Sequence, residues 1–316
     1  TVHGFPLCAL FSCWLLARIA WLFGSSALAF AAFFDLLFIS CLMVAVARPI
    51  IASKQWRQMA ILSKLALLAL GNFIFYAEAF DFYLFFEHAA LGMHTAIYGG
   101  VYLTVGLILT IGRRIIPLFV QNGVGYEVKL YNSKWLDISS LVFFLIFFIS
   151  ELFIQSLSLS QFSATMMFLI TSTRIIGWYT HGIWKSPLLW CFYAALFFID
   201  VGFLLFSLSS LLSLPPYIYL HAFAVGAIGV ITMGMMARVS TGHTGRSLKS
   251  LPRRIFFSLY LLTLGAFVRV FLPLIFPDLH PYWIALSGFF WLCAFSLFCS
   301  LFLPYWFRAR VDQKYG

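Results

Sequence analysis

The sequence predicts an all-α, polytopic transmembrane helix bundle of about ten spans, for three reasons. Of its 316 residues, 63% are hydrophobic and only 9% are charged, whereas a soluble domain carries about 25% charged residues. Its apolar stretches reach about 20 residues, the length of a helix that crosses a hydrocarbon core of about 30 Å. Its basic residues also concentrate in alternate connections between these stretches. An ordinary soluble globular protein is therefore excluded.

The expected spans follow one another along a single membrane domain that covers residues 1–316. Each is an apolar run bounded by polar or turn-forming residues. The spans are centred on residues 5–23, 27–47, 61–80, 89–110, 136–155, 162–179, 187–208, 217–237, 255–275 and 282–303.

The distribution of charge predicts the orientation of the chain. Connections on one side hold the Lys and Arg residues, whereas the opposite connections hold Asp81, Glu87 and Asp278. Because cytoplasmic loops are enriched in Lys and Arg, both ends are expected in the cytoplasm. The net charge of +10 then reflects topology, so the expected partner is a lipid bilayer and not nucleic acid.

One stretch, "HAFAVGAIGVITMGMMARVSTGHTGRSL" (221–248), combines an apolar helix with titratable ends. His221 opens it, Arg238 closes its apolar part, and His243 follows between two glycines. At a rise of about 1.5 Å per residue, His221 and Arg238 lie about 25 Å apart. His221 and His243 are thus expected on opposite faces of the membrane, in separate sites.

Histidines are the candidate metal ligands, because neutral imidazole ligates haem iron, copper and zinc. The candidates are His88, His94, His221 and His243. Their spacings, six and 22 residues within a segment, fit poorly with di-haem cytochrome b bundles. Three histidines near membrane depth are also too few for a haem–copper oxidase. His181 and His280 are placed in connections and receive no role.

Other features of the same stretch have two interpretations each. Ala222, Gly226 and Gly229 form a small-residue face that suits either helix packing or a flat macrocycle. The methionines at 233, 235 and 236 are either core residues or soft ligands for copper(I). Arg238 and Arg246 suit either haem propionates at the inner boundary or a solvated basic loop.

Ionisable residues inside apolar spans are costly and are therefore functional candidates. Those found are Arg18, Asp35, Glu151, Asp200 and Arg269. Arg18 and Arg269 lie in the outer halves of their spans, against the positive-inside trend. We expect them to hold carboxylates such as Glu151 or Asp200, or an anionic cofactor; a structural pair or snorkelling is the alternative.

Three patches resemble the NnrS family of bacterial membrane proteins. The long stretch resembles the family pattern H-A-x-x-V-G-x-(I/M)-G followed by R-x-(S/T)-x-G-H-T-G-R. The segment "IGRRIIPLF" (111–119) resembles the family's G-G-R-(V/I)-I-P segment. The segment "RARVD" (308–312) resembles the R-x-R-V-D ending of the family. Arg113 replaces the second glycine of G-G-R. Family members usually have further helices that bear an H-A-H-E segment, and this chain is expected to begin after them.

The resemblance implies a multi-pass protein of the bacterial inner membrane, associated with haem and copper, that contributes to resistance to nitric oxide and binds or processes species derived from it. It implies His221 as an axial haem ligand, with His88, His94 or His243 as further metal ligands. The residues that match the patterns, and are expected to hold cofactor, are His221, Arg238, His243, Thr244, Arg246 and Arg114.

Nothing in the sequence specifies a complete catalytic cycle. The main alternative is a transporter or permease without a redox cofactor, in which Arg18, Asp35, Asp200 and Arg269 line a polar pathway. A second alternative is a membrane assembly partner that holds no cofactor of its own. The visible colour of the purified protein separates the haem-associated protein from the transporter, because a transporter of this kind is colourless.

Overall fold

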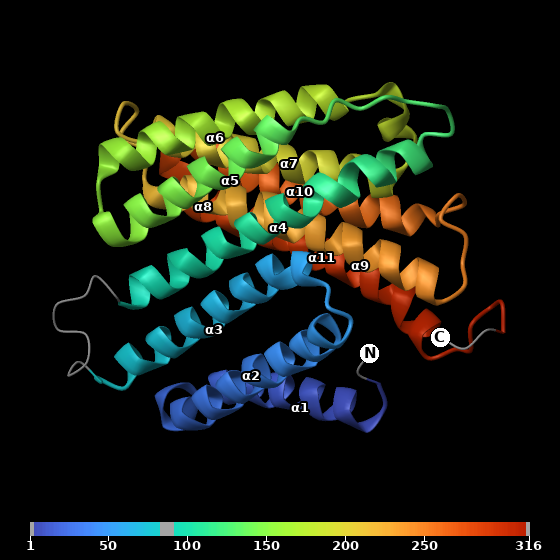
Figure 1. Ribbon diagram of the computed structural model, residues 1–316, viewed down its shortest axis with the longest axis horizontal. Coiled ribbons are helices and arrows are strands. Elements are labelled where there is room, and N and C mark those ends of the chain that lie inside the picture. The colour runs from blue at the N-terminus through green and yellow to red at the C-terminus, as the bar shows by residue number, and fades with distance from the viewer. Residues whose placement is uncertain (1–2, 83–91, 314–316) are drawn as a thin grey trace. The chain divides into compact units, whose positions relative to one another are not determined.

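The computed structural model describes residues 3–82 and 92–313, and within them the chain is helical, without strands (Figure 1). The prediction of an all-α protein is confirmed. The α-helices are α1 (Phe5–Ala20), α2 (Leu28–Ala52), α3 (Met59–Ala79), α4 (Met93–Gly123), α5 (Lys134–Ile149), α6 (Leu157–Trp178), α7 (Pro187–Ser207), α8 (Pro216–His221), α9 (Val230–His243), α10 (Arg253–Ile275) and α11 (His280–Trp306).

Eight helical segments of the described chain are long and apolar enough to cross a membrane. The first, Phe5–Ala52, contains both α1 and α2, which are joined through a 3-10 turn where Gly24 adopts a φ of 65°. Helix α6 has 22 residues but is interrupted by serine and threonine, and it is not among the eight. These features explain the difference from ten, and the cytoplasmic placement of both ends stays a prediction.

Helix α4 is longer than its predicted span, which ended at residue 110. It continues through the expected connection to Gly123, with Pro117 inside the helix. A proline removes one backbone N–H donor and usually kinks a helix without always ending it. Arg113 and Arg114 therefore lie on a helix and not in a loop.

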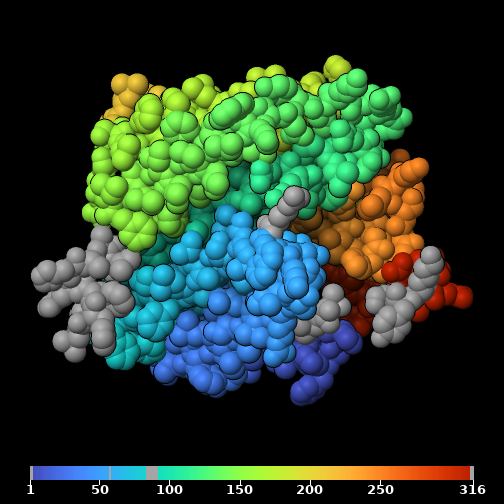
Figure 2. All heavy atoms as spheres, in the orientation of Figure 1, coloured from blue at the N-terminus to red at the C-terminus, as the bar shows by residue number. Residues whose placement is uncertain are grey.

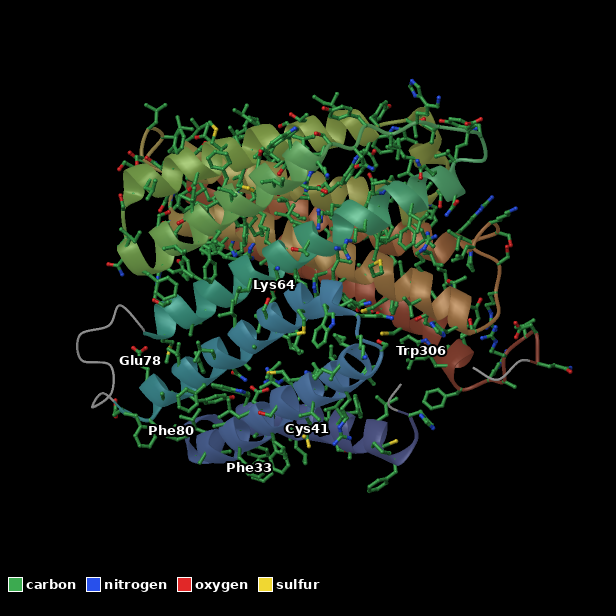
Figure 3. The ribbon with its side chains drawn as sticks, in the orientation of Figure 1. Phe33, Cys41, Lys64, Glu78, Phe80 and Trp306 are labelled. Atoms are coloured by element: carbon green, nitrogen blue, oxygen red, sulfur yellow. The ribbon has the colours of Figure 1, made fainter. Side chains whose placement is uncertain are left out.

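The chain divides into two compact units, Thr1–Leu107 and Ile108–Gly316. In the first unit, α1 packs on α2 and α2 packs on α3. Helix α4 begins here, and the backbone N–H of Met93 in its first turn donates to the carboxylate of Glu78. Figure 3 shows Glu78 near the end of α3. A carboxylate at this position satisfies a free N–H group and complements the helix dipole.

In the second unit, α7 is the central helix. It is apolar on all sides and most of its side chains are buried, as expected for a helix surrounded by others. Helices α6 and α9 pack on it. The side chains of α5 and α6, green to yellow-green in Figure 2, cover part of the face of this unit that the view shows. Several of them are large, apolar and exposed, including Leu141, Phe162 and Ile176, as expected of a lipid-facing surface.

The segment that carries the long sequence motif is continuous from Pro216 to His243. Between α8 and α9 it forms a π-helix, Ala222–Gly229. Gly226 of this π-helix lies against α7, where an added Cβ would be 2.2 Å from Cγ of Phe198. At Gly226 the small-residue face therefore serves helix packing, and Phe198 occupies the space that a macrocycle would need.

Candidate functional site

Four polar side chains of the second unit meet where α8, α10 and α11 come together. The guanidinium of Arg269 lies against the imidazole of His221, with Nη2 3.2 Å from Nε2. The ring of Tyr217 lies 6.0 Å from that of His221 and 4.4 Å from that of His280. We call His221, Arg269, His280 and Tyr217 the histidine cluster.

Local sequence places Tyr217, His221 and His280 at helix ends, whereas Arg269 lies within α10. His221 is the last residue of α8, directly before the π-helix. His280 is the first residue of α11 and follows a 3-10 turn at Pro277–Leu279. π-Helical segments are rare in proteins, and those that occur are often found at functional sites. The adjacent π-helix thus marks His221 as a functional candidate by backbone geometry as well as by residue type.

His280 has a feature that a purely structural histidine should lack. Its Nε2 atom is buried and has no hydrogen-bond partner among the described residues. A buried polar atom without a partner costs about 1–3 kcal/mol, so each case needs an explanation. A ligand bound at Nε2 would supply the missing partner, whereas Nε2 of His221 already faces Arg269.

The sequence analysis missed His280, which it placed in a connection without a role. The available signal was its position: like His221, it stands at the boundary of an apolar span, here directly before Pro281. Its meeting with Tyr217 depends on how α8 and α11 pack in three dimensions, and spacing within one helix cannot report that contact.

The other predicted metal ligands do not join the histidine cluster within the described residues. His243 is exposed at the far end of the Pro216–His243 segment, as expected for a separate site. His94 is exposed on α4 in the first unit, where its ring stacks on Tyr98 at 3.9 Å. His88 lies outside the described residues.

The predicted cofactor-binding arginines near His243 lie on aromatic rings. The guanidinium of Arg238 is 3.6 Å from the ring centre of Phe119, and that of Arg246 is 3.5 Å from the ring centre of Tyr305. Such cation–π contacts stabilise both partners. Arg114 is exposed on α4.

Thr244 has a structural role in the same region. Its hydroxyl donates to the carbonyl oxygen of Ser240 at 2.7 Å, in the last turn of α9. Its own carbonyl oxygen accepts from the backbone N–H of Val311. The three sequence patches are therefore in contact, through Arg238 with Phe119 and through Thr244 with Val311.

The intramembrane charges meet the expectation in part. Arg18 holds a carboxylate, that of Asp35. Arg269 faces an imidazole and not a carboxylate. Asp200 accepts from the hydroxyl of Ser172 at 2.8 Å, and its Oδ1 atom is buried without a partner in the described chain.

Within the described residues, no group of three or more His, Cys, Asp or Glu side chains could hold a metal ion. Met233 is fully buried and its sulfur accepts from the hydroxyl of Ser258 at 3.2 Å, which favours the core interpretation of that methionine. The arrangement can therefore supply one or two imidazole ligands at the histidine cluster, but not a complete set of protein ligands.

Outside the membrane segments, Tyr126 links the α4–α5 connection to the α6–α7 connection. Its hydroxyl bonds with that of Thr180 and accepts from the backbone N–H of Gly182 at 3.0 Å. These two hydrogen bonds favour the ionised phenolate and lower the pKa of Tyr126. This contact fixes the α6–α7 connection against the end of α4.

Comparison with known proteins gives one match. The family model described as NnrS protein matches residues 1–310, nearly the whole chain. No curated protein matches, and no solved structure matches.

Proposed function

This chain belongs to the NnrS family, and from that premise we propose a function. We propose that the protein is associated with haem and contributes to resistance to nitric oxide. The eight long apolar helical segments of the described residues are those of a multi-pass membrane protein. The bacterial inner membrane, the haem and nitric oxide as the ligand are parts of the proposal. The observation that carries it is the Nε2 atom of His280, which is buried beside His221 and has no hydrogen-bond partner in the described part of the chain.

The histidine cluster fits a haem better than a metal ion held by protein ligands alone. A porphyrin supplies four ligands to its iron, so the protein needs to add only one or two axial groups. His280 offers an imidazole nitrogen without a partner, and His221 offers a second imidazole nearby. When bound, haem would supply an iron that takes nitric oxide as a ligand.

The remaining side chains of the cluster orient the two imidazoles. The ring of Tyr217 lies close to that of His280, tilted by 37°, and would limit its rotation. Arg269 holds His221 and also provides a fixed positive charge, which suits a carboxylate such as a haem propionate. In this proposal His280 would hold the iron, and His221 would be a further ligand or a positioning residue.

Copper fits these residues less well. A protein copper site takes several nitrogen or sulfur ligands, and the described residues gather no group of three or more His, Cys, Asp or Glu side chains for it. We therefore derive no step through copper. His243, with Arg238, Arg246 and Arg114, stays a proposed second site on the opposite face, where the arginines would steady anionic groups.

Visible absorption spectra test the proposal. Purified protein is measured oxidised, reduced and after addition of nitric oxide, with metal and haem analysis of the same sample. A Soret band that shifts with nitric oxide is expected. Because an axial imidazole is required, His280→Gly should lose or shift the band, and free imidazole should restore it.

Matched variants give this experiment its controls. His221→Ala should alter the band less than His280→Gly, because Arg269 already occupies Nε2 of His221. His181→Ala, at an exposed histidine of the α6–α7 connection, should leave the spectrum unchanged. A protein that contains haem but keeps its spectrum in both His280→Gly and His221→Ala would place the site elsewhere, with His243→Ala as the next variant.

A colourless protein would favour the alternative, a transporter without a redox cofactor. That alternative depends on Arg18, Asp35, Asp200 and Arg269 lining one pathway. The pairings support it weakly, because each of these charges has its own local partner: Arg18 with Asp35, Asp200 with Ser172 and Arg269 with His221.

A further inference from the structure

The first unit contains a cavity that the proposed function does not use. Its volume is about 500 Å³ and it is open rather than enclosed. Pockets that bind small molecules are of this size, mostly apolar, with a few convergent polar groups. The polar groups here are Arg18, Asp35, Asn72 and Tyr76, and all lining residues belong to the first unit.

The polar wall of the cavity contains hydrogen-bond donors and an acceptor that a ligand could use. Arg18 forms an ion pair with Oδ2 of Asp35, and the hydroxyl of Tyr76 donates to the same oxygen at 2.8 Å. Both contacts are made by Oδ2 of Asp35, and Oδ1 is the other acceptor of this carboxylate. The Arg18 side chain is 44% exposed and the Asp35 side chain 12%. The cavity therefore offers guanidinium N–H donors beside one carboxylate acceptor.

The charges of this wall cancel. A bound anion would leave the site with a net negative charge in a medium of low dielectric constant, and this is costly. A lipid tail would leave the remaining N–H groups of Arg18 without partners. The wall instead suits an uncharged group that accepts from Arg18 and donates to Asp35.

Aromatic side chains form part of the apolar wall. Trp14, Trp21 and Phe75 line the cavity. The ring of Trp21 lies 6.0 Å from that of Phe75 and 6.2 Å from that of Tyr76. Aromatic rings pack on one another by offset stacking or edge-to-face contact. A flat ring is thus the shape that this wall favours.

Two glycines leave the space open. A Cβ added at Gly100 would meet no atom within 4 Å, and one added at Gly71 would meet only the carbonyl oxygen of Ala96, at 3.7 Å. A larger side chain at Gly100 would therefore occupy the cavity without a backbone clash.

We propose that this cavity binds a lipid-soluble quinone or quinol. Such a molecule is uncharged and flat, carries carbonyl or hydroxyl groups, and reaches a membrane protein through the bilayer. A quinone would accept from Arg18 through a carbonyl oxygen, whereas a quinol hydroxyl would accept from Arg18 and donate to Asp35, and in both forms the ring would lie against the aromatic side chains. The inference concerns binding alone and does not depend on haem.

Photolabelling tests where the quinone binds. A photoreactive azidoquinone is added to the 316-residue protein in quinone-free lipid nanodiscs. After illumination, labelled peptides are identified by mass spectrometry. The label is expected on α1 or α3, and excess decylubiquinone should compete it away. Label spread evenly over lipid-facing helices, or label displaced equally by stearic acid, would overturn the proposal.

Two variants test the site itself. Gly100→Leu fills the cavity and should reduce labelling at least about tenfold, whereas Gly288→Leu is a matched control, because a Cβ there also meets no atom within 4 Å. The double variant Arg18→Gln with Asp35→Asn keeps the shape but removes both charges. Since hydrogen bonds to charged groups are the stronger ones, labelling should fall about tenfold.

Both variants are first checked for an unchanged elution volume and thermal unfolding temperature. Should Gly100→Leu fail to fold, the double variant carries the test, because its amides keep the hydrogen bond between the two side chains. Wild-type labelling in the double variant would overturn the assignment of Arg18 and Asp35, and wild-type labelling in folded Gly100→Leu would overturn the cavity.

Discussion

The backbone N–H of Val311 donates a hydrogen bond of 3.3 Å to the carbonyl oxygen of Thr244. It joins the glycine-rich turn after α9 to the segment that follows α11. Both segments belong to patches that the sequence singled out, and neither has enough apolar side chains to hold its place by burial. Hydrogen bonds and ring contacts, such as that of Arg246 on Tyr305, therefore fix the chain here.

Gly245→Ala should loosen this contact. Gly245 adopts a φ of 74°, which other residues rarely adopt, and an added Cβ would lie 2.9 Å from Oδ1 of Asp312. We expect trypsin to cut after Arg308 and Arg310 several-fold faster than in the wild type. Gly242→Ala is the control, because a Cβ there meets no atom within 4 Å. Equal cleavage of both variants would contradict the role of the turn.

Gly226→Ala should destabilise the packing of the π-helix on α7. The new Cβ would lie 2.2 Å from Cγ of Phe198, and overpacking of this kind costs about 1–3 kcal/mol. The midpoint of thermal unfolding in detergent should fall. In the same segment, Gly229→Ala meets only the carbonyl oxygen of Ala224, at 3.6 Å, and should leave the midpoint unchanged or raise it, because alanine favours helix. A fall in the unfolding midpoint of both variants would indicate that the π-helix tolerates no alanine, independently of the contact with Phe198.

Length and apolarity predicted the helices well, because a bilayer of fixed thickness demands runs of about 20 apolar residues. The separation of His221 from His243 also followed from the sequence, since the rise of a helix fixes the distance between its ends. The extension of α4 from residue 110 to Gly123 did not follow, because an apolar span ends before charged residues such as Arg113 and Arg114, whereas the helix itself continues through them.

Pairings between helices were less predictable. Arg18 meets Asp35 on the next helix, and His280 meets Tyr217 from a different helix. Such contacts depend on the rotation and register of packed helices, and apolar spans without a clear polar face leave both undetermined. Ring partners for Arg238 and Arg246 were missed for the same reason.

Tyr126 should titrate below the usual range of a tyrosine. The pKa of Tyr126 is lowered by its hydrogen bonds from Thr180 and Gly182. Because the folded pKa lies below the unfolded value of about 10, this group adds stability as pH rises through the folded pKa, and loses that contribution as pH falls back through it. Absorbance at the phenolate band should rise earlier in the wild type than in Tyr126→Phe. Identical titration curves would contradict the hydrogen-bonded phenolate.

Asp137→Asn should destabilise the second unit more than the loss of an exposed ion pair does. Asp137 binds Arg113 at 2.6 Å through Oδ2 and Arg174 at 2.9 Å through Oδ1. Arg174 is only 4% exposed, so the variant leaves a buried cation without a carboxylate. Breaking a buried pair costs about 3–5 kcal/mol, and the partial exposure of Asp137 reduces this to about 2 kcal/mol.

The matched control is Arg310→Gln, which removes the partly exposed pair of Arg310 with Asp312. Exposed pairs contribute about 0–1 kcal/mol, because water screens their charges. Thermal unfolding of both variants, at low and at high salt, separates the two environments: added salt should reduce the small effect of Arg310→Gln and leave most of the effect of Asp137→Asn. If Asp137→Asn unfolds at the wild-type temperature, Arg174 has enough other support from the carbonyl oxygen of Leu136 and Asp137 is not the residue that neutralises it.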